Sequence, residues 1–327
     1  MKAWKWSAGV WLTICMIAGL ALTSYAEGVS PADSQVKGIL YRVSGKGSTA
    51  YILGSIHIGN QDMYPFGEAI LKSMAQADAF VFECDNESQE AVMAARSLMY
   101  DQNGLLLEEK VSPECYEKLR QVCKIKGYSL ANFDTLHPWA IFSQLSFDVA
   151  AGQMGVDSAK AAQKLGVDAH VKAFARRERK EIHYLETVQE QLGELNGLSL
   201  ALQNHMLEQT LDAILDPSTV KGIDADIGSW PILWKNGDAR AFADSYWKGY
   251  NEDAQPELVQ EYHQSLVTDR NILMADRLAA MMEENPRTYF VTIGLLHVVL
   301  AGDSVVELLQ EKGYQVECLS QPKEDAQ

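Results

Sequence analysis

Two short motifs with the same spacing stand near opposite ends of the chain. In each, a β-prone run stops at a glycine and a histidine follows three residues later: Gly54 precedes His57, and Gly294 precedes His297. Ligands of open α/β sheets bind beyond the carboxyl ends of the strands, where a glycine lets the backbone turn tightly or approach a ligand. The two histidines are therefore expected to meet at one site, and neutral imidazole suits Zn, Mn, Co or Fe.

A carboxylate is expected to complete this set. Glu83 ends the buried run 79–82, so it also falls at a strand end, where a carboxylate is costly unless it binds a cation or a network of donors. Two histidines and one carboxylate leave a metal open positions for water, as catalysis requires. We predict that His57, Glu83 and His297 hold one divalent ion. The alternative, two hydrogen-bonded loop histidines and a salt-bridged glutamate, stays open.

Four further polar residues are candidates for supporting roles. Asp168 opens a predicted helix and is first of all a good helix cap. Glu186 follows a short β run and could bind the metal, act as a base, or cap the next helix. Arg270 could stabilise developing negative charge, with Asn271 beside it. For each of them an ordinary structural role is the competing interpretation.

The elements that must position these residues indicate an α/β (α+β) fold. Runs at 39–43 and 49–54 predict a hairpin, followed by a helix to about 77 and a buried strand at 79–83. The middle, about 87–285, is mostly helical and contains a short β run at 181–185. Runs at 288–294 and 314–319 return to strand. The pattern predicts a central sheet built from the two ends of the chain and covered by a helical layer.

Composition and the N-terminus indicate an exported protein. The 327 residues carry a net charge of −16, which argues against nucleic-acid binding. Residues 1–26 have a positive start, an apolar run and a Ser-Tyr-Ala ending at Ala26, which predicts a signal peptide cleaved after Ala26. We expect a periplasmic or secreted single domain over 27–327, with no stable membrane anchor after cleavage. Export would permit disulfides. Cys115–Cys123 is the favoured pair and Cys84 could pair with Cys318, but four cysteines allow three pairings and the choice stays open.

Taken in order, the motifs resemble the TraB/PrgY/GumN family, whose animal relatives are the Tiki proteases. The resemblance rests on five boxes that together span nearly all of the chain after Ala26. The boxes are 51–59 with its Gly-x-x-His, the acidic strand 77–83, Gly166-Val167-Asp168 with Leu185-Glu186-Thr187, Asp269-Arg270-Asn271, and the closing box 290–297.

This resemblance implies a fold related to the erythromycin esterase and ChaN-like group. For the Tiki proteins it implies Mn- or Co-dependent peptide cleavage that uses both Gly-x-x-His motifs and a glutamate. Those roles map to His57, His297 and Glu83 here.

The sequence thus predicts an exported metal-dependent hydrolase that cleaves a peptide or protein substrate. Its metal would be Mn, Co or Zn. The alternative is a non-catalytic protein that sequesters a peptide or haem in the same cleft. A scaffold in which both histidines are structural is the third possibility.

Overall fold

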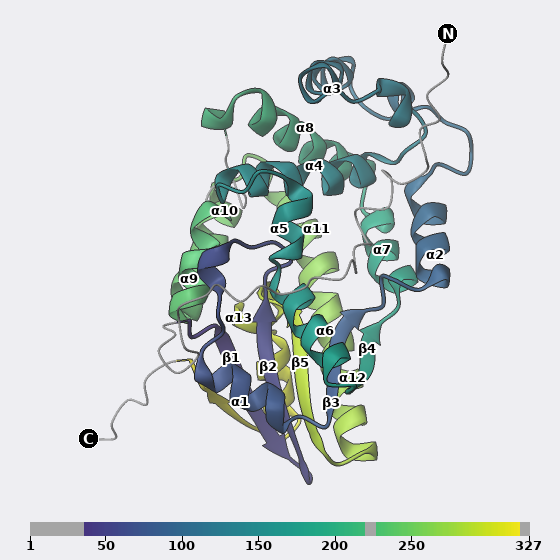
Figure 1. The fold of residues 1–327 in the computed structure, drawn as a ribbon. Coiled ribbons are helices and arrows are strands. Elements are labelled where there is room, and N and C mark those ends of the chain that lie inside the picture. Colours follow the sequence, from purple (N-terminus) through teal and green to yellow (C-terminus); the bar gives the residue numbers. More distant parts are fainter. Residues whose placement is uncertain (1–35, 220–226, 321–327) are drawn as a thin grey trace.

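A six-stranded mixed sheet forms the base of the molecule (Figure 1). The computed structural model describes residues 36–219 and 227–320, so the predicted signal peptide and its cleavage site after Ala26 lie outside the described residues. The sheet order is β4-β3-β5-β2-β1-β6. The strands are β1 (Ile39–Gly45), β2 (Ser48–Ser55), β3 (Ala79–Cys84), β4 (Glu181–Glu186), β5 (Thr288–Gly294) and β6 (Gln315–Cys318).

The four strands β4, β3, β5 and β2 run parallel to one another, so their carboxyl ends share one edge of the sheet. The predicted hairpin is confirmed, because β1 pairs antiparallel with β2. The predicted β run at 181–185 is confirmed and belongs to the same sheet. The middle of the chain contributes β4, which pairs with β3 and places Glu186 at the shared edge.

Helices cover both faces of the sheet. On one face, α1 (Glu68–Gln76) and α6 (Val167–Arg177) pack against alternate residues of the strands, including Phe80 and Phe290. On the other, α12 (Asp269–Glu284) and α14 (Val305–Glu311) pack against Val81 and Val291. Successive strand residues point to opposite faces, and strands buried on both faces read as continuous apolar runs. This explains the unbroken hydrophobicity of β3 and β5.

A second helical unit lies above the shared strand edge (Figure 1). Its members have their own hydrophobic cluster, centred on buried Trp139, Leu119 and Leu207. They are α2 (Gln89–Met99), α3 (Pro113–Lys126), α4 (Pro138–Gln153), α7 (Val188–Gly197) and α8 (Leu200–Leu215). The remaining α-helices of the described residues are α5 (Ala159–Lys164), α9 (Trp230–Asn236), α10 (Ala239–Glu252), α11 (Pro256–His263) and α13 (Leu296–Val299). The functional edge of the sheet is therefore roofed by helices from the middle of the chain.

Neither disulfide considered from the sequence is shown: no disulfide joins any of the four described cysteines. Cys115 and Cys123 lie in the single helix α3, and eight residues of helix separate their Cα atoms by about 12 Å. Cys84 on β3 and Cys318 on β6 are four strand positions apart, roughly 19 Å. A disulfide needs Cα atoms within about 7 Å.

Within 36–219 and 227–320, no helix has the length and apolar character that crossing a bilayer requires.

Candidate functional site

A cavity of about 530 Å³ lies between the shared strand edge and the helical roof. Its floor carries six of the predicted residues, which come from five different segments of the chain. They are His57, Glu83, Asp168, Arg270, Gly294 and His297. Three other predicted residues, Gly54, Glu186 and Asn271, do not line it. The volume lies within the range typical of small-molecule and peptide sites.

The His57 side of the site consists of His57, Ser55 and Asp168. Asp168 accepts hydrogen bonds from Ser55 Oγ (2.8 Å) and lies 2.9 Å from His57 Nδ1. Its carboxylate raises the pKa of His57 to about 9. The His57 side chain is 55% exposed and faces the cavity. Among the described residues its Nε2 has no hydrogen-bond partner. Because the raised pKa keeps the ring protonated at neutral pH, a metal ion that binds at Nε2 would have to displace its proton.

Backbone contacts hold the His57 segment against the start of α6. The Val167 amide donates to the Ile56 carbonyl at 3.0 Å. A Cβ placed on Gly166 would lie 2.4 Å from the His57 carbonyl oxygen, which only glycine avoids. Gly166, not Asp168, is therefore the residue that caps α6. Asp168 sits in the first turn, and its side chain is left for His57 and Ser55.

The His297 side of the site consists of His297, Asn271 and Arg270. His297 follows β5 in the short helix α13 and is only 5% exposed. Its Nδ1 lies 2.7 Å from Asn271 Oδ1 on α12. Burial, together with the positive charge of Arg270, lowers the pKa of His297 to about 3, so the ring is neutral. An amide oxygen at Nδ1 makes that atom the donor and leaves Nε2 as the acceptor.

Glu83 lies between the two histidines at the end of β3. Its Oε1 accepts from the Gly294 amide, and its Oε2 accepts from Gln191 Nε2 (2.7 Å) and Arg270 Nη2 (2.9 Å). Burial by itself would raise the pKa of Glu83, but Arg270 and the other donors hold it well below its usual range. Three donors fill three of the roughly four lone-pair positions of a carboxylate. One position on Oε1 remains.

Glu186, for which the sequence left the roles of ligand, base and helix cap open, lies behind Arg270. Both of its oxygens are bound by Arg270, to Nε at 2.9 Å and to Nη2 at 2.7 Å. Its side chain is 1% exposed and does not line the cavity. Burial raises its pKa, against the effect of Arg270. Because Glu186 lies behind the guanidinium, it orients Arg270 and does not reach a molecule in the cavity.

The two sides of the site meet at Gly294. A Cβ on Gly294 would lie 3.0 Å from Glu83 Oε1, 3.3 Å from His297 Cδ2 and 3.8 Å from His57 Nε2. One point in the site is thus within 4 Å of all three predicted ligands, and a side chain there would fill it. Gly54, by contrast, lies within β2, where an added Cβ would meet the flexible end of Leu295 at 2.4 Å.

The donor set has the chemistry of a divalent-metal site. Histidines that bind metals through Nε2 usually donate Nδ1–H to a carboxylate or a carbonyl oxygen, and His57 and His297 are both held in this way. Within the described ranges, no three His, Cys, Asp or Glu side chains already converge closely enough to hold an ion. An ion would therefore have to draw His57, Glu83 and His297 together.

Two features of the site have weak or no signals in the sequence. A π-helical segment, Gln264–Thr268, joins α11 to α12 and contributes Leu266 and Val267 to the cavity. Helical periodicity does not reveal one wide turn, although such turns are frequent at functional sites. Lys172 also lines the cavity, one turn after Asp168 on α6. The spacing of four residues places Lys172 on the same helix face as Asp168, and this signal is present in the sequence.

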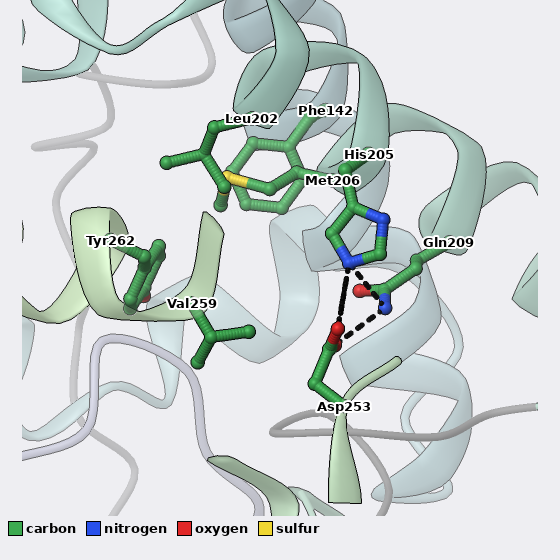
Figure 2. Close-up of a pocket in the computed structure, with 8 residues that line it drawn as sticks. All are labelled: Phe142, Leu202, His205, Met206, Gln209, Asp253, Val259 and Tyr262. Atoms are coloured by element: carbon green, nitrogen blue, oxygen red, sulfur yellow. Dashed lines mark hydrogen bonds and ion pairs between the residues drawn. The ribbon is translucent and has the colours of Figure 1, made fainter. Parts of the chain in front are cut away.

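A smaller pocket of about 50 Å³ lies against the cavity and shares Phe142 and Tyr262 with it (Figure 2). It contains a polar network in which Asp253 accepts from His205 Nε2 (3.1 Å) and Gln209 Nε2 (2.9 Å). The network joins α8 to the end of α10. The pocket has room for a few water molecules at most, so we assign the chemistry to the larger cavity.

The chain belongs to the TraB/PrgY/gumN family, whose model matches residues 39–318. It is 26% identical over 254 residues to the protein YbaP of Escherichia coli (strain K12), covering 77% of this chain and 85% of YbaP. It is also 22% identical to metalloprotease TIKI1 of Danio rerio and 21% identical to that of Homo sapiens. These alignments cover 96% and 97% of this chain and 70% of each relative. No solved structure matches, so the predicted likeness to the ChaN group stays a prediction.

Proposed function

We propose that this chain is an exported metal-dependent hydrolase that cleaves peptide bonds. The observation that carries the proposal is the paired anchoring of the two histidines. Each comes from the end of a parallel strand, each has Nδ1 held by an oxygen, and each ring borders the space around Gly294. The relationship to the Tiki metalloproteases supports the same reading.

Nε2 of His57, Nε2 of His297 and the remaining lone pair of Glu83 Oε1 would hold the ion. A bound divalent ion would polarise the scissile carbonyl and lower the pKa of a water. Asp168 and Asn271 fix the orientation of the two rings. Hydrogen-bond acceptors at the outer nitrogen of a metal-binding histidine typically account for 10–100-fold in metal affinity.

Arg270 is the residue placed to stabilise developing negative charge. Its guanidinium lines the cavity and is fixed from behind by Glu186 and at the side by Glu83. A preoriented cation in a site with little water stabilises an oxyanion more than a mobile one does. Of the roles that the sequence left open for Glu186, these contacts support a positioning role toward Arg270.

The walls of the cavity support a peptide substrate with large apolar side chains. Opposite the charged floor, aromatic and aliphatic residues come from α4, α9, α10 and the π-helical segment. They are Phe142, Phe147, Trp230, Phe242, Leu266 and Val267. Binding sites of this composition bury apolar groups and use a few polar residues for orientation.

Metal titration tests the proposal. The chain without residues 1–26 is stripped of metal and titrated separately with Mn²⁺, Co²⁺ and Zn²⁺. We expect about one ion per chain, loss of that ion in His57→Ala and in His297→Ala, and no loss in the control His205→Ala. The loaded protein is then incubated with a defined peptide library, and the cleavage products are identified by mass spectrometry.

Two results would contradict the proposal. One is the absence of binding by any of the three ions, and the other is binding that survives both histidine substitutions. In either case the cavity would be a binding site without hydrolysis. Uncleaved peptide retained by the protein, or a Soret band on adding haem, would then identify the class of ligand.

A further inference from the structure

Lys172 is a buried cation on the cavity wall that the proposed chemistry does not use. Its side chain is 11% exposed, and the residue as a whole 9%. Lysine is almost never this buried unless it is paired, because removing an ammonium from water costs several kcal/mol. The position lies on α6 one turn after Asp168, about 6 Å away along the same helix face.

The partners of Lys172 in the protein are distant. Its Nζ is 3.4 Å from Asn86 Oδ1 and 3.6 Å from Glu87 Oε1, longer than the roughly 2.7–3.2 Å of well-formed hydrogen bonds. Two aromatic rings lie near the ammonium, Phe82 at 5.3 Å and Tyr184 at 5.7 Å. These contacts hold the charge in place without using its donors fully. The ammonium has three donors and no close acceptor.

The nearest carboxylate to Lys172, that of Glu87 at 3.6 Å, is shared with a second cation. Glu87 is bound by the guanidinium of Arg176. Asp168 is engaged by His57 and Ser55. Asn86, Glu87, Asp168 and Lys172 all line the cavity, so a ligand can reach this group from inside.

From this geometry we infer that Lys172 binds a carboxylate of the substrate, within the same cavity and about one helical turn from the histidine floor. The carboxylate has two possible sources in a peptide: the C-terminus, or the side chain of Asp or Glu. The inference rests on the proposed function in that it names a recognition element of the same site. Lys172 would set specificity and would take no part in bond cleavage.

Equilibrium binding to the metal-depleted chain tests the inference without turnover. Two matched pairs of peptides are titrated by calorimetry. The first pair is N-acetyl-Ala-Phe-Ala with a free or an amidated C-terminus, and the second is N-acetyl-Ala-Phe-Glu-amide or its Gln counterpart. We expect the carboxylate member of one pair to bind about tenfold to a hundredfold more tightly, as a charge-assisted hydrogen bond provides. The pair that shows the preference identifies the source.

Three variants make the test specific to Lys172. Lys172→Met keeps a stem that packs on Phe82 and Tyr184 but removes the charge, and it should abolish the preference. Lys164→Met is the matched control, because Lys164 is an exposed lysine on the same cavity and should leave the preference unchanged. Glu87→Gln removes the competing carboxylate and should tighten carboxylate binding, which provides a second test if Lys172→Met does not fold.

The inference is overturned if neither pair shows a preference, or if the preference survives in Lys172→Met. Its failure is distinguishable from that of the proposed function. Metal binding without a carboxylate preference removes only the role of Lys172. A Lys172-dependent preference without metal binding removes the hydrolase and leaves a cavity that binds acidic ligands.

Discussion

The two Gly-x-x-His units have the same spacing and the same topological position, yet the protein holds their histidines by different means. His297 is buried, neutral and fixed by side chains of α12, namely Asn271 beside it and Arg270 nearby. His57 is exposed to the cavity, paired with a carboxylate, and fixed by backbone contact between its segment and the start of α6. One side of the site is therefore part of the protein core, and the other lies on its surface.

This difference suggests how the site could work. A metal centre that must take up and release ligands needs one rigid partner and one that can adjust. The His297 side is integrated with the ion network of Arg270, Glu83 and Glu186, so it cannot move without disturbing the core. The His57 side can shift its ring within the open cavity. Substitutions on the two sides should accordingly separate effects on stability from effects on metal binding.

The largest expected effect is on the His297 side, from Arg270→Met. This change leaves Glu83 and Glu186 buried without their cation, and breaking a buried ion pair from one side costs about 3–5 kcal/mol. The free energy of unfolding, measured by urea titration, should fall by that amount.

Arg277→Met is the matched control for this prediction. Arg277 lies on the same helix and also pairs with a glutamate, Glu190, but both side chains are more than one-third exposed. Exposed pairs contribute about 0–1 kcal/mol. If Arg270→Met and Arg277→Met lower the free energy of unfolding by the same amount, the His297 side is not part of the core in the way described.

An intermediate effect is expected on the His57 side from Gly166→Ala. The added methyl group would collide with the His57 carbonyl, and overpacking of this kind costs about 1–3 kcal/mol. Because the backbone of the His57 segment must move, metal affinity should fall as well. Gly193→Ala in α7 is the control, since nothing lies within 4 Å of its Cβ position and alanine favours a helix by about 0.5–1 kcal/mol. Equal stability of the two variants would contradict the backbone-contact account.

Much of the fold followed from local patterns in the sequence. The run at 288–294 is continuous, β-branched and bounded by Arg287 and Leu295, and β5 has those limits. The shared edge for His57, Glu83 and His297 followed from strand ends alone, because parallel neighbours place their carboxyl ends together. These inferences need only two facts: side chains alternate between the two faces of a strand, and the strands run in the same direction.

The roles of the individual carboxylates did not follow from the sequence, because several of them stand at the end of a strand. Glu83 and Glu186 have the same local context, since each stands at the end of a strand. Only the folded structure shows that Glu83 lines the cavity, whereas Glu186 lies behind Arg270. The partner of Asp168 was equally hidden, since a first-turn aspartate commonly caps its own helix. The disulfide pairing was left open for a similar reason: proximity in sequence, or in strand position, carries no information on Cα separation across a helix or sheet.

The smallest effect on stability, combined with a clear effect on function, is expected from Asp168→Asn. Asp168 lies at the cavity surface, so its stability cost should stay below about 1 kcal/mol. Asparagine still offers one oxygen, but it removes the negative charge that orients and polarises His57. Metal affinity should therefore fall about 10–100-fold, as it does when outer partners of metal-binding histidines are changed. Asp148→Asn is the control for metal affinity: Asp148 does not line the cavity and is bound by Tyr128, so its substitution should leave metal affinity unchanged. Unaltered metal affinity in Asp168→Asn would mean that the His57 ring is oriented by the cavity itself. A loss of several kcal/mol in stability would mean that both sides of the site belong to the core, and the contrast between the two histidines would then be one of exposure only.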